Sequence, residues 1–330
     1  MQITIAQAKE FLDKITPEDR VAIVFHNDPD GYASAICFAE YLKEIPNISF
    51  YEAELINGIK PYLEKLKDSD KIIFSDLAPN VINNGFEKLK DKKILYVDHH
   101  SKDAEITESI LEFRTPSYEP ASLDAFLITG KEEFLAFLGM IADAGWKYSE
   151  NQDYINEELR KYNLSLDEAK KLGDDFGFLL KINKGEVKKN IELLKGIKRP
   201  DDFTKFEEIL KPVKDELNFF IKDFENKKER IGEIYFYYFD PKLCGKAAVI
   251  NEVSYFNPDA ILVFTTPKEN EMISISARNQ SGKISCVELL KKATIGFENS
   301  SSGGHVPAAG GHILKKDLEK FKENLREIKI

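Results

Sequence analysis

Cysteine is scarce in this sequence of 330 residues. The three cysteines, Cys37, Cys244 and Cys286, lie far apart, and no two of them form a CxxC pair. A disulfide framework and a zinc ribbon are therefore both unexpected. This usage is typical of a reducing compartment, so we expect a cytoplasmic protein.

Long apolar runs and an excess of positive charge are also missing. No stretch approaches the ~20 apolar residues that cross a membrane, and the first residues, MQITIAQAKEFLDKI, lack the basic segment and apolar core of a signal peptide. The formal net charge of -10 argues against a protein that coats long duplex DNA through many Lys and Arg contacts. It is compatible with a short anionic substrate held by metal ions. We therefore expect a soluble protein with no membrane partner.

Histidine is rare but clustered. Each of the five histidines lies in a polar, glycine-bearing or carboxylate-bearing cluster: His26, His99, His100, His305 and His312. Neutral imidazole is a common ligand of divalent transition metals, and its cation binds phosphate oxygens. The clustering therefore indicates metal or phosphate chemistry.

The first part of the chain has the pattern of an α/β domain. After an amphipathic helical stretch over residues 6–20, short apolar runs predict strands over 21–25, 48–51, 72–75 and 94–97. Three of these runs end in candidate ligands, and helical stretches separate them. This arrangement predicts a parallel sheet with its site along the carboxyl ends of the strands.

A second α/β pattern begins near residue 231, after a charged, helix-prone segment with few strand signals. We expect a metal-binding domain over 1–149, a helical connector over 150–229 and a smaller α/β domain over 230–330, because the chain is long enough for two cores. The two α/β domains are expected to face each other across an active-site cleft. We interpret the lysine-rich segment 181–199 as a solvated face, with a basic wall for an anionic strand as the alternative. The connector could also carry a surface for a protein partner.

The sequence HNDPDG follows the first predicted strand and places ligand-type side chains at alternate positions. Side chains at i and i+2 of an extended segment point the same way, so His26, Asp28 and Asp30 are expected to converge above the strand end. Gly31 permits a tight entry into the next helix. By itself the loop could also be an ordinary Asp-Pro-Asp-Gly turn.

Three further residues, Asp76, His99 and Asp143, extend this set to six potential ligands. Asp143 lies in the apolar stretch FLAFLGMIADAGW, where a carboxylate is costly unless it is paired or binds metal. The alternative is a helix-end Asp that faces solvent or caps a turn near Gly145. Mixed oxygen and nitrogen ligands without thiolate suit Mn²⁺ or another divalent ion. Two such ions ~3.5–4 Å apart neutralise a phosphoryl transition state, so we expect hydrolysis of a phosphate ester or anhydride.

Five motifs, in this order, resemble those of the DHH-family phosphoesterases that carry a DHHA1 domain, the group of RecJ-type exonucleases and nanoRNases. HNDPDG resembles the first family motif, FSDLAP around Asp76 the second and VDHH the third. ADAG around Asp143 resembles the fourth, and SGGHVPAAGG resembles the glycine-histidine substrate motif of DHHA1. The resemblance covers both ends of the chain and leaves the connector unmatched.

The resemblance implies a role for each matching residue of the first domain. One metal ion is expected at His26, Asp28 and Asp76, and a second at Asp30, Asp76, His99 and Asp143, with Asp76 bridging the two ions. Asp98 is expected to orient a neighbouring imidazole. His100 is expected to face the scissile phosphate as an electrophilic donor and not as a ligand.

In the second domain, small residues in SARNQSG and SGGHVPAAGG allow a backbone to approach a phosphate, and Arg278 can bind one bidentately. By resemblance, Gly303, Gly304 and His305 grip the terminal nucleotide while Arg278 holds a phosphate. The alternative is that the two glycines only end a helix and turn into a strand. His312 lies outside the motif, and we interpret it as a structural residue.

We therefore predict a Mn²⁺-dependent phosphodiesterase that hydrolyses single-stranded RNA or DNA, or short oligonucleotides, from an end, with the 3′ to 5′ direction somewhat favoured. Mg²⁺ and Co²⁺ are the alternative ions. The alternative activities are a cyclic- or linear-dinucleotide phosphodiesterase and, third, a polyphosphatase or pyrophosphatase. A non-enzymatic scaffold is disfavoured because competent residues fill every metal position. The sequence does not specify RNA against DNA, the direction, the physiological metal, protein partners or the oligomeric state.

Overall fold

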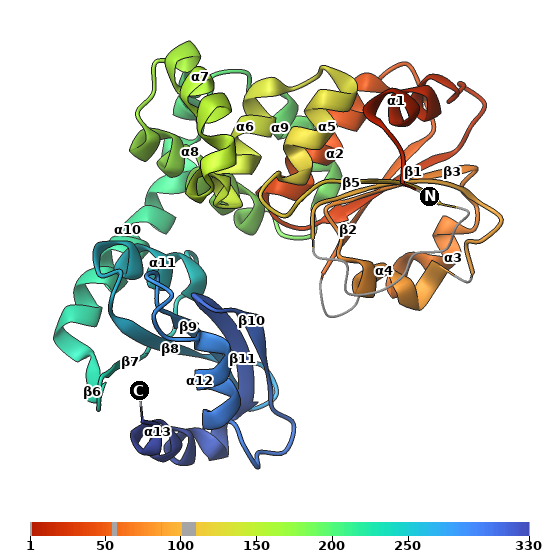
Figure 1. The fold of residues 1–330 in the computed structure, drawn as a ribbon. Helices are drawn as coiled ribbons and strands as arrows, with labels where there is room; N and C mark the ends of the chain where they lie inside the picture. Colours follow the sequence, from red (N-terminus) through yellow and green to blue (C-terminus); the bar gives the residue numbers. More distant parts are fainter. Residues whose placement is uncertain (1, 55–57, 87, 101–109, 330) are drawn as a thin grey trace. The chain divides into compact units, whose positions relative to one another are not determined.

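The computed structural model describes residues 2–54, 58–86, 88–100 and 110–329. Its contacts group the chain into two compact units, Met1–Glu207 and Glu208–Ile330. Each unit is built around one sheet with helices on it (Figure 1). The predicted α/β class with two sheets is confirmed, and the predicted cleft between the domains stays a prediction.

The sheet of the first unit has five parallel strands in the order β2-β1-β3-β4-β5. The strands are β1 Val21–His26, β2 Ile48–Ala53, β3 Lys71–Ser75, β4 Lys93–Asp98 and β5 Leu111–Arg114. The three central strands are apolar runs buried along nearly their whole length, as expected where helices cover both faces of a sheet. The predicted parallel sheet is confirmed, and β5 is a strand that the apolar runs did not predict. Because the strand order reverses between β1 and β3, their carboxyl ends form a switch point, where ligands commonly bind in such sheets.

Helices lie on both faces of this sheet (Figure 1). They are α1 Ile5–Asp13, α2 Pro29–Tyr41, η1 Lys60–Tyr62, α3 Leu63–Leu66, α4 Pro79–Phe86, α5 Ala121–Thr129, α6 Glu133–Ala142, η2 Gly145–Lys147 and η3 Ser149–Asn151. On one face, α2 packs against α5 and α6. On the other face, α3 and α4 close a core that includes Ile72, Phe74 and Ile94. Helix α1 ends at Asp13, before Pro17, and packs beside the edge strand β5.

A group of helices that follows α6 also belongs to the first unit. These helices are α7 Gln152–Tyr162, α8 Leu166–Ile182, α9 Val187–Lys195 and η4 Pro200–Phe206. Asn190 of α9 donates from Nδ2 to the hydroxyl of Tyr32 on α2 at 3.3 Å, and Lys184 forms an ion pair with Glu54 at 3.3 Å. These contacts tie the segment to the rest of the first unit, while the division into functional domains at 149/150 and 229/230 stays a prediction.

The second unit contains a mixed six-stranded sheet in the order β10-β11-β9-β8-β7-β6, in which only β7 and β8 pair in parallel. Its elements are α10 Glu207–Lys227, β6 Glu229–Ile231, β7 Ile234–Tyr238, α11 Lys246–Phe256, β8 Ile261–Lys268, β9 Met272–Arg278, α12 Cys286–Ala293, β10 Ser301–His305, β11 Ala308–Leu314, η5 Lys315–Asp317 and α13 Leu318–Glu327. One face packs on α12 and α13 through a core that includes Ile275, Leu290 and Phe321. Among the described residues, no helix is both long and apolar enough to span a bilayer.

The glycine-rich segment near the end of the chain is a β-hairpin. β10 and β11 pair antiparallel, with Gly304 opposite Ala309, and Val306 and Pro307 join them. The alternative that Gly303 and Gly304 end a helix is therefore wrong, because α12 already ends at Ala293. The sequence pattern did not predict these two strands, because the run of glycines lacks β-branched and aromatic residues.

Candidate metal centre

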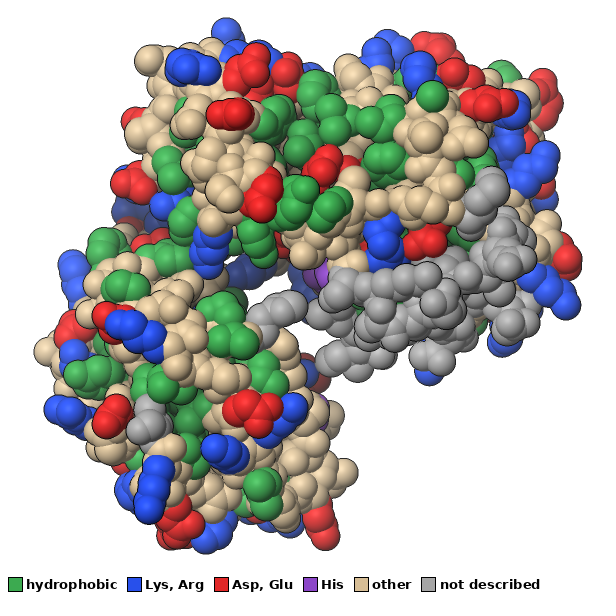
Figure 2. Space-filling model, in the orientation of Figure 1, with side chains coloured by type: hydrophobic (Ala, Val, Ile, Leu, Met, Phe, Trp, Pro, Cys, Tyr) green, Lys and Arg blue, Asp and Glu red, His purple; other side chains and the backbone are tan. Residues whose placement is uncertain are grey.

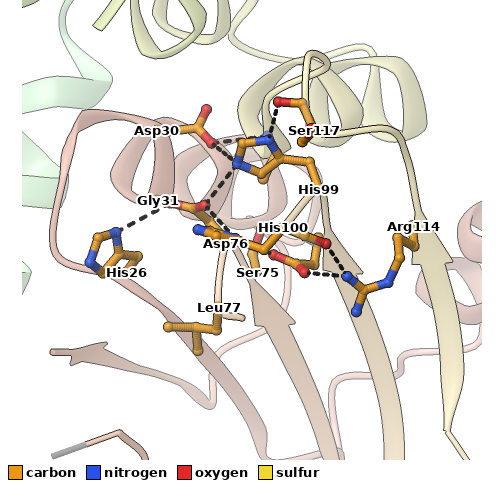
Figure 3. Close-up of polar contacts among 12 residues, drawn as sticks. His26, Asp30, Gly31, Ser75, Asp76, Leu77, His99, His100, Arg114 and Ser117 are labelled. Carbon is orange, nitrogen blue, oxygen red and sulfur yellow. Dashed lines mark hydrogen bonds and ion pairs between the residues drawn. The ribbon is translucent and has the colours of Figure 1, made fainter. Parts of the chain in front are cut away.

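The six predicted metal ligands come from the carboxyl ends of β1, β3 and β4 and from the ends of α2 and α6. The structure brings their ligand atoms into overlapping groups whose members lie within 4.8 Å of one another: His26, Asp28 and Asp76; Asp30, His99 and Asp143; and Asp76, His99 and His100. Figure 3 shows Asp76 between His26 on one side and His99 on the other. The metal-binding role of each residue stays a prediction that this clustering supports.

The loop after β1 is shaped by a helix cap. Asp28 is the extended N-cap residue of α2, and its Oδ1 accepts from the amide of Gly31 at 3.0 Å. Its Oδ2 lies 2.7 Å from Nδ1 of His26. A Cβ on Gly31 would lie 2.1 Å from the carbonyl oxygen of His26, so only glycine permits this close entry into the helix.

Asp30 was expected to point toward the site because it alternates with Asp28 along an extended loop. The expected extended loop is wrong, because Asp30 lies in the first turn of α2 and is buried. Its two carboxylate oxygens accept from the amides of Ala121 and Ser122 at 2.9 and 3.0 Å. Asp30 thereby caps the N-terminus of α5, because Pro120 at the N-cap position makes no side-chain hydrogen bond. Burial, followed by the charge of Asp76, raises the pKa of Asp30 to about 7.

Asp76 has a left-handed backbone immediately after β3. Its φ is +57°, a conformation that is uncommon for residues other than glycine, and its amide donates to the carbonyl of Val97 on β4 at 3.0 Å. Its Oδ1 lies 3.4 Å from Nε2 of His99, and its Oδ2 lies 3.6 Å from Nδ1 of His26. Burial acts to raise the pKa of Asp76, but the interactions with the two histidines outweigh burial and lower it. The carboxylate therefore stays charged between two imidazoles.

His99 is oriented by a backbone carbonyl. Its Nδ1 lies 3.3 Å from the carbonyl oxygen of Ser117, which accepts the ring proton and so leaves Nε2 as the nitrogen that can bind a metal. Nε2 lies 3.8 Å from Asp30 and 3.8 Å from Asp143 in addition to its contact with Asp76. Burial acts to lower the pKa of His99, but these carboxylates outweigh burial and raise the pKa to about 11. The surroundings of Nε2 therefore favour a positive charge.

Asp143 does not lie inside an apolar helix as expected. It is the C-cap residue of α6, because Ala144 adopts a left-handed φ of +62° and ends the helix. The helix-end alternative therefore describes its position, and its side chain is 37% exposed. Its Oδ2 nevertheless faces His99 at 3.8 Å.

Asp98 is fully buried and contacts the imidazole of His100. Its Oδ1 accepts from Nδ1 of His100 at 2.8 Å, and its Oδ2 accepts from the Tyr96 hydroxyl at 2.8 Å and from Arg114 Nη1 at 3.0 Å. Arg114 also donates to the carbonyl of His100 and, through Nε, to Glu112 at 2.8 Å. Because Asp98 engages Nδ1, Nε2 of His100 is the nitrogen left to contact a substrate. The side chain of His100 is 35% exposed.

Several residues of this network were missed from the sequence. Arg114 lies on β5, where register places it opposite Asp98, and the four residues LEFR carry too little pattern to predict a strand. Asp124 of α5 is also buried and accepts from the Thr115 hydroxyl at 2.7 Å. Its other oxygen has no hydrogen-bond partner in the described part of the chain. An aspartate in the helical pattern ASLDAFL was the one signal that could have identified it.

The residues present fit divalent metal ions. Oδ2 of Asp76 is buried and, among the described residues, accepts no hydrogen bond. Such a group is costly unless a cation binds it. Burial acts to lower the pKa of His26, but Asp28 and Asp76 outweigh burial and raise it to about 11. Carboxylates and imidazoles without thiolate form a donor set suited to Mn²⁺, Mg²⁺ or a similar ion, and Asp76 offers one oxygen to each group of ligands.

The predicted substrate residues lie in the second unit. Arg278 is the last residue of β9, and its guanidinium donates to Asn251 Oδ1 and to the carbonyl of Ala277, both at 2.9 Å. The two glycines differ: Gly304 has a φ of +136° that favours glycine, whereas a Cβ on Gly303 would meet open space. The side chain of His305 lies outside the described residues. The substrate-binding roles of these residues stay predictions.

Two family models match the chain. A model of the DHH family N-terminal domain matches residues 20–161, and a model of the DHHA1 domain matches residues 235–329. The first match includes every residue of the candidate metal centre, and the two matches together cover more than half of the chain. The chain belongs to the DHH family. It is a DHH-family phosphoesterase with a DHHA1 domain, as its motifs predicted.

The DHH phosphoesterase shares its fold with solved structures of low sequence identity. An exonuclease RecJ bound to manganese matches with a TM-score of 0.71 and 15% identity, over 98% of this chain and 93% of that one. The DHH domain of a protein described as a member of the s1p family of ribosomal proteins matches with a TM-score of 0.72 and 15% identity, over 99% and 91% of the two chains. An exopolyphosphatase-related protein from Bacteroides fragilis matches with a TM-score of 0.52 and 15% identity, over 98% and 95%.

These matches establish a RecJ-like fold for the DHH phosphoesterase and leave its substrate open, because identities of 15% show the fold alone. No curated protein matches the sequence.

Proposed function

We propose that this DHH phosphoesterase is a Mn²⁺-dependent exonuclease that hydrolyses single-stranded RNA or DNA, or short oligonucleotides, from an end by a two-metal mechanism. The observation that carries the proposal is the position of Asp76. Its two carboxylate oxygens face different imidazoles, at 3.6 and 3.4 Å, within two adjacent groups of ligand atoms. A carboxylate so placed is suited to bridge two ions.

The first unit contributes the ligands. One ion is proposed at His26, Asp28 and Asp76, and the second at Asp30, Asp76, His99 and Asp143. Divalent cations in these positions supply Lewis acidity and charge neutralisation for phosphoryl transfer. The carbonyl of Ser117 holds His99 in the tautomer that a ligand needs, and the amides of α5 hold Asp30 in place. These contacts preorganise the ligands before an ion arrives.

His100 is proposed as the electrophilic donor to a nonbridging phosphate oxygen. Burial acts to lower its pKa, but the hydrogen bond with Asp98 outweighs burial and raises it, so the surroundings favour the protonated ring. Arg114 and Tyr96 fix Asp98 from the other side. A positioned cation of this kind stabilises charge that develops in the transition state.

The second unit is proposed to bind the substrate end. Arg278 would hold a phosphate, while Gly303, Gly304 and His305 contact the terminal nucleotide. Open space above Gly303 supports this role, because a backbone strand without a side chain lets a ligand approach closely. The 3′ to 5′ direction is the direction we favour for this exonuclease.

A substrate panel tests the proposed function. Purified protein with Mn²⁺ should cleave end-labelled RNA or DNA oligomers faster than a cyclic dinucleotide or polyphosphate. Preference for polyphosphate would show that the nuclease assignment is wrong, and preference for the cyclic dinucleotide would favour the dinucleotide phosphodiesterase. The absence of hydrolysis with every substrate would favour a binding protein.

A matched pair of variants tests the metal centre. Asp76→Asn preserves the side-chain shape and suits the left-handed backbone, but it should lower kcat by about 10³-fold or more because a neutral amide cannot bridge two ions. Asp70→Asn is the control and should leave kcat unchanged. Asp70 lies at the opposite end of β3 from Asp76 and pairs with exposed Arg20 at 3.2 Å. Retained turnover in Asp76→Asn would refute the two-metal assignment.

A further inference from the structure

One face of the second sheet presents a row of polar side chains. Along β9, Ile273, Ile275 and Ala277 enter the core with α12 and α13, and the residues that alternate with them therefore point to the opposite face. These alternating residues are Ser274, Ser276 and Arg278. Helix α11 packs on β8 and β9, and its side chains meet this polar row.

Lys246, the first residue of α11, lies against the row. Its Nζ donates to the hydroxyl of Ser274 at 2.7 Å, and its side chain is partly buried. A lysine ammonium has three donors, so the hydroxyl engages only one of them. Burial, and then the charges of Arg278 and Lys268, lowers the pKa of Lys246 to about 7.

Arg278 has neutral partners as well. Its Nε donates to Asn251 and one Nη1 proton to the carbonyl of Ala277, which leaves three of its five N–H donors. Burial also lowers the pKa of Arg278. Within the described part of the chain, neither Lys246 nor Arg278 contacts a carboxylate.

This pair lacks the carboxylate partners that several lysines of the second unit have. On the face of the molecule in Figure 2, blue Lys and Arg side chains are interspersed with red Asp and Glu side chains. Nearby lysines have carboxylate partners: Lys242 pairs with Asp240 at 2.6 Å and Lys283 with Asp259 at 2.9 Å. Two adjacent, partly buried cations without such partners are unfavourable unless an anion binds them.

The sheet beside the pair can accept a ligand. Register places His312 of β11 and Ser301 of β10 in line with Ser274, and Ser301 Oγ lies 2.8 Å from His312 Nδ1. Two residue pairs further along, and so on the same face, Gly303 lies opposite Gly310. A Cβ on Gly303 would meet nothing within 4 Å, and a Cβ on Gly310 only the carbonyl of Ile275 at 3.7 Å. The glycine pair therefore leaves room above a hydroxyl- and imidazole-bearing surface.

We propose that Lys246 is a second phosphate-binding residue of this enzyme, which acts with Ser274 and Arg278 on the polar face of the second sheet to bind the phosphate groups of the substrate strand. The inference rests on the proposed function, because it takes an oligonucleotide as the substrate. It extends the site beyond the glycine-histidine and arginine motifs to a residue on α11. A bound phosphate would be the anionic partner that neither cation has among the carboxylates of the described residues.

Binding without catalysis tests this role. The full chain is titrated in EDTA with a fluorescein-labelled single-stranded RNA oligonucleotide, and the dissociation constant is measured by anisotropy at several salt concentrations. Lys246→Met keeps the aliphatic stem and should weaken binding about tenfold, the effect of one charge-assisted hydrogen bond. It should also reduce the slope of log affinity against log salt by about 0.7, as expected for one lost phosphate contact on a single strand.

Two further variants make the test specific. Lys246→Arg retains the charge and should restore most of the affinity, while Lys242→Met removes a lysine four residues away that already pairs with Asp240 and should leave affinity and slope unchanged. A thermal melt checks that each variant is folded. Wild-type affinity and slope in folded Lys246→Met would overturn the proposal, as would an equal loss in Lys242→Met.

A parallel titration with tripolyphosphate separates this inference from the proposed function. If wild-type protein binds tripolyphosphate but no oligonucleotide, the exonuclease assignment fails, and weaker tripolyphosphate binding by Lys246→Met still supports the phosphate role of Lys246. If wild-type protein binds the oligonucleotide and Lys246→Met binds it equally well, only the role of Lys246 fails.

Discussion

At the scale of single residues, small contacts assign different tasks to the neighbouring histidines of the VDHH motif. The carbonyl of Ser117 takes the Nδ1 proton of His99 and turns Nε2 toward three carboxylates. Asp98 instead engages Nδ1 of His100 and leaves Nε2 as the nitrogen that can contact a substrate. The same side chain therefore serves as a proposed ligand at one position and as a proposed phosphate contact at the next.

The two histidines should respond differently to alanine substitution. His99→Ala should abolish turnover and reduce the number of bound Mn²⁺ ions from two to one, because it removes a ligand. His100→Ala should lower kcat by about 10²- to 10³-fold and retain both ions, because it removes only a transition-state contact. Isothermal titration with Mn²⁺ and single-turnover kinetics measure these effects, and loss of an ion in His100→Ala would show that His100 is a ligand.

Arg278 should contribute to binding more than to chemistry. Arg278→Ala should raise KM about tenfold or more, because it removes a charged hydrogen-bond donor to phosphate, while kcat and Mn²⁺ stoichiometry change little. Steady-state kinetics on a short oligonucleotide measure both constants. Lys283→Ala is the control, since exposed Lys283 pairs with Asp259, and an unchanged KM in Arg278→Ala would argue against the phosphate role.

At the scale of elements, the N-terminus of α2 determines where two of the proposed ligands lie. Asp28 caps this helix, whereas Asp30 in its first turn accepts from the amides that begin α5. One short loop thus joins β1, α2 and α5. The contact buries a carboxylate at a helix N-terminus, where the amides and the helix dipole stabilise negative charge.

Two glycine substitutions test how strongly that loop is constrained. Gly31→Ala should destabilise the first unit by roughly 1–3 kcal/mol, because the new methyl group overlaps the carbonyl of His26, and it should weaken Mn²⁺ binding. Gly177→Ala lies in the interior of α8, where the nearest atom to a Cβ is Pro29 Cγ at 3.6 Å. It should stabilise the protein by up to ~1 kcal/mol. Urea unfolding measures both, and a neutral Gly31→Ala would contradict the proposed loop constraint.

At the scale of the whole molecule, the charge of the candidate metal centre is expected to make stability depend on bound ions. Three further carboxylates gather around Asp76 and His99, and burial raises the pKa of Asp30. Divalent ions that bind the folded arrangement and not the unfolded chain would stabilise the native state by mass action. The second unit contains none of these ligands.

Removing metal should therefore lower the stability of the first unit selectively. Mn²⁺ at a hundredfold excess over its dissociation constant should stabilise that unit by about 2.7 kcal/mol relative to protein in EDTA. Hydrogen exchange, monitored by mass spectrometry, should show the change in peptides of β1, β3 and β4 and not in those of β7 to β9. Asp76→Asn should lose most of the Mn²⁺-dependent protection from exchange. If Mn²⁺ increased protection equally in both units, the result would contradict a metal site confined to the first unit.

Much of the fold and the candidate site followed from local patterns. The apolar runs before Asp76 and Asp98 predicted strands because central parallel strands are buried on both faces, and parallel strands bring their carboxyl ends to one edge. The alternation argument failed for Asp30 because Pro29 starts a helix, where its ring is tolerated and its missing amide is not needed. The predicted helix continued past Asp143, whereas α6 ends just before it. Helix ends are hard to predict because they can depend on the backbone conformation of a single residue, here Ala144.

The sequence by itself determined the order of the motifs, the identity of the proposed ligands and the family, because these depend on residue type and on spacing along the chain. Only the tertiary structure decided which atoms face one another. The pairing of Arg114 with Asp98, the cap that Asp30 provides for α5 and the contact of Lys246 with Ser274 join residues distant along the chain. No local periodicity encodes such pairs, because strand register and helix packing bring them together only when the core forms.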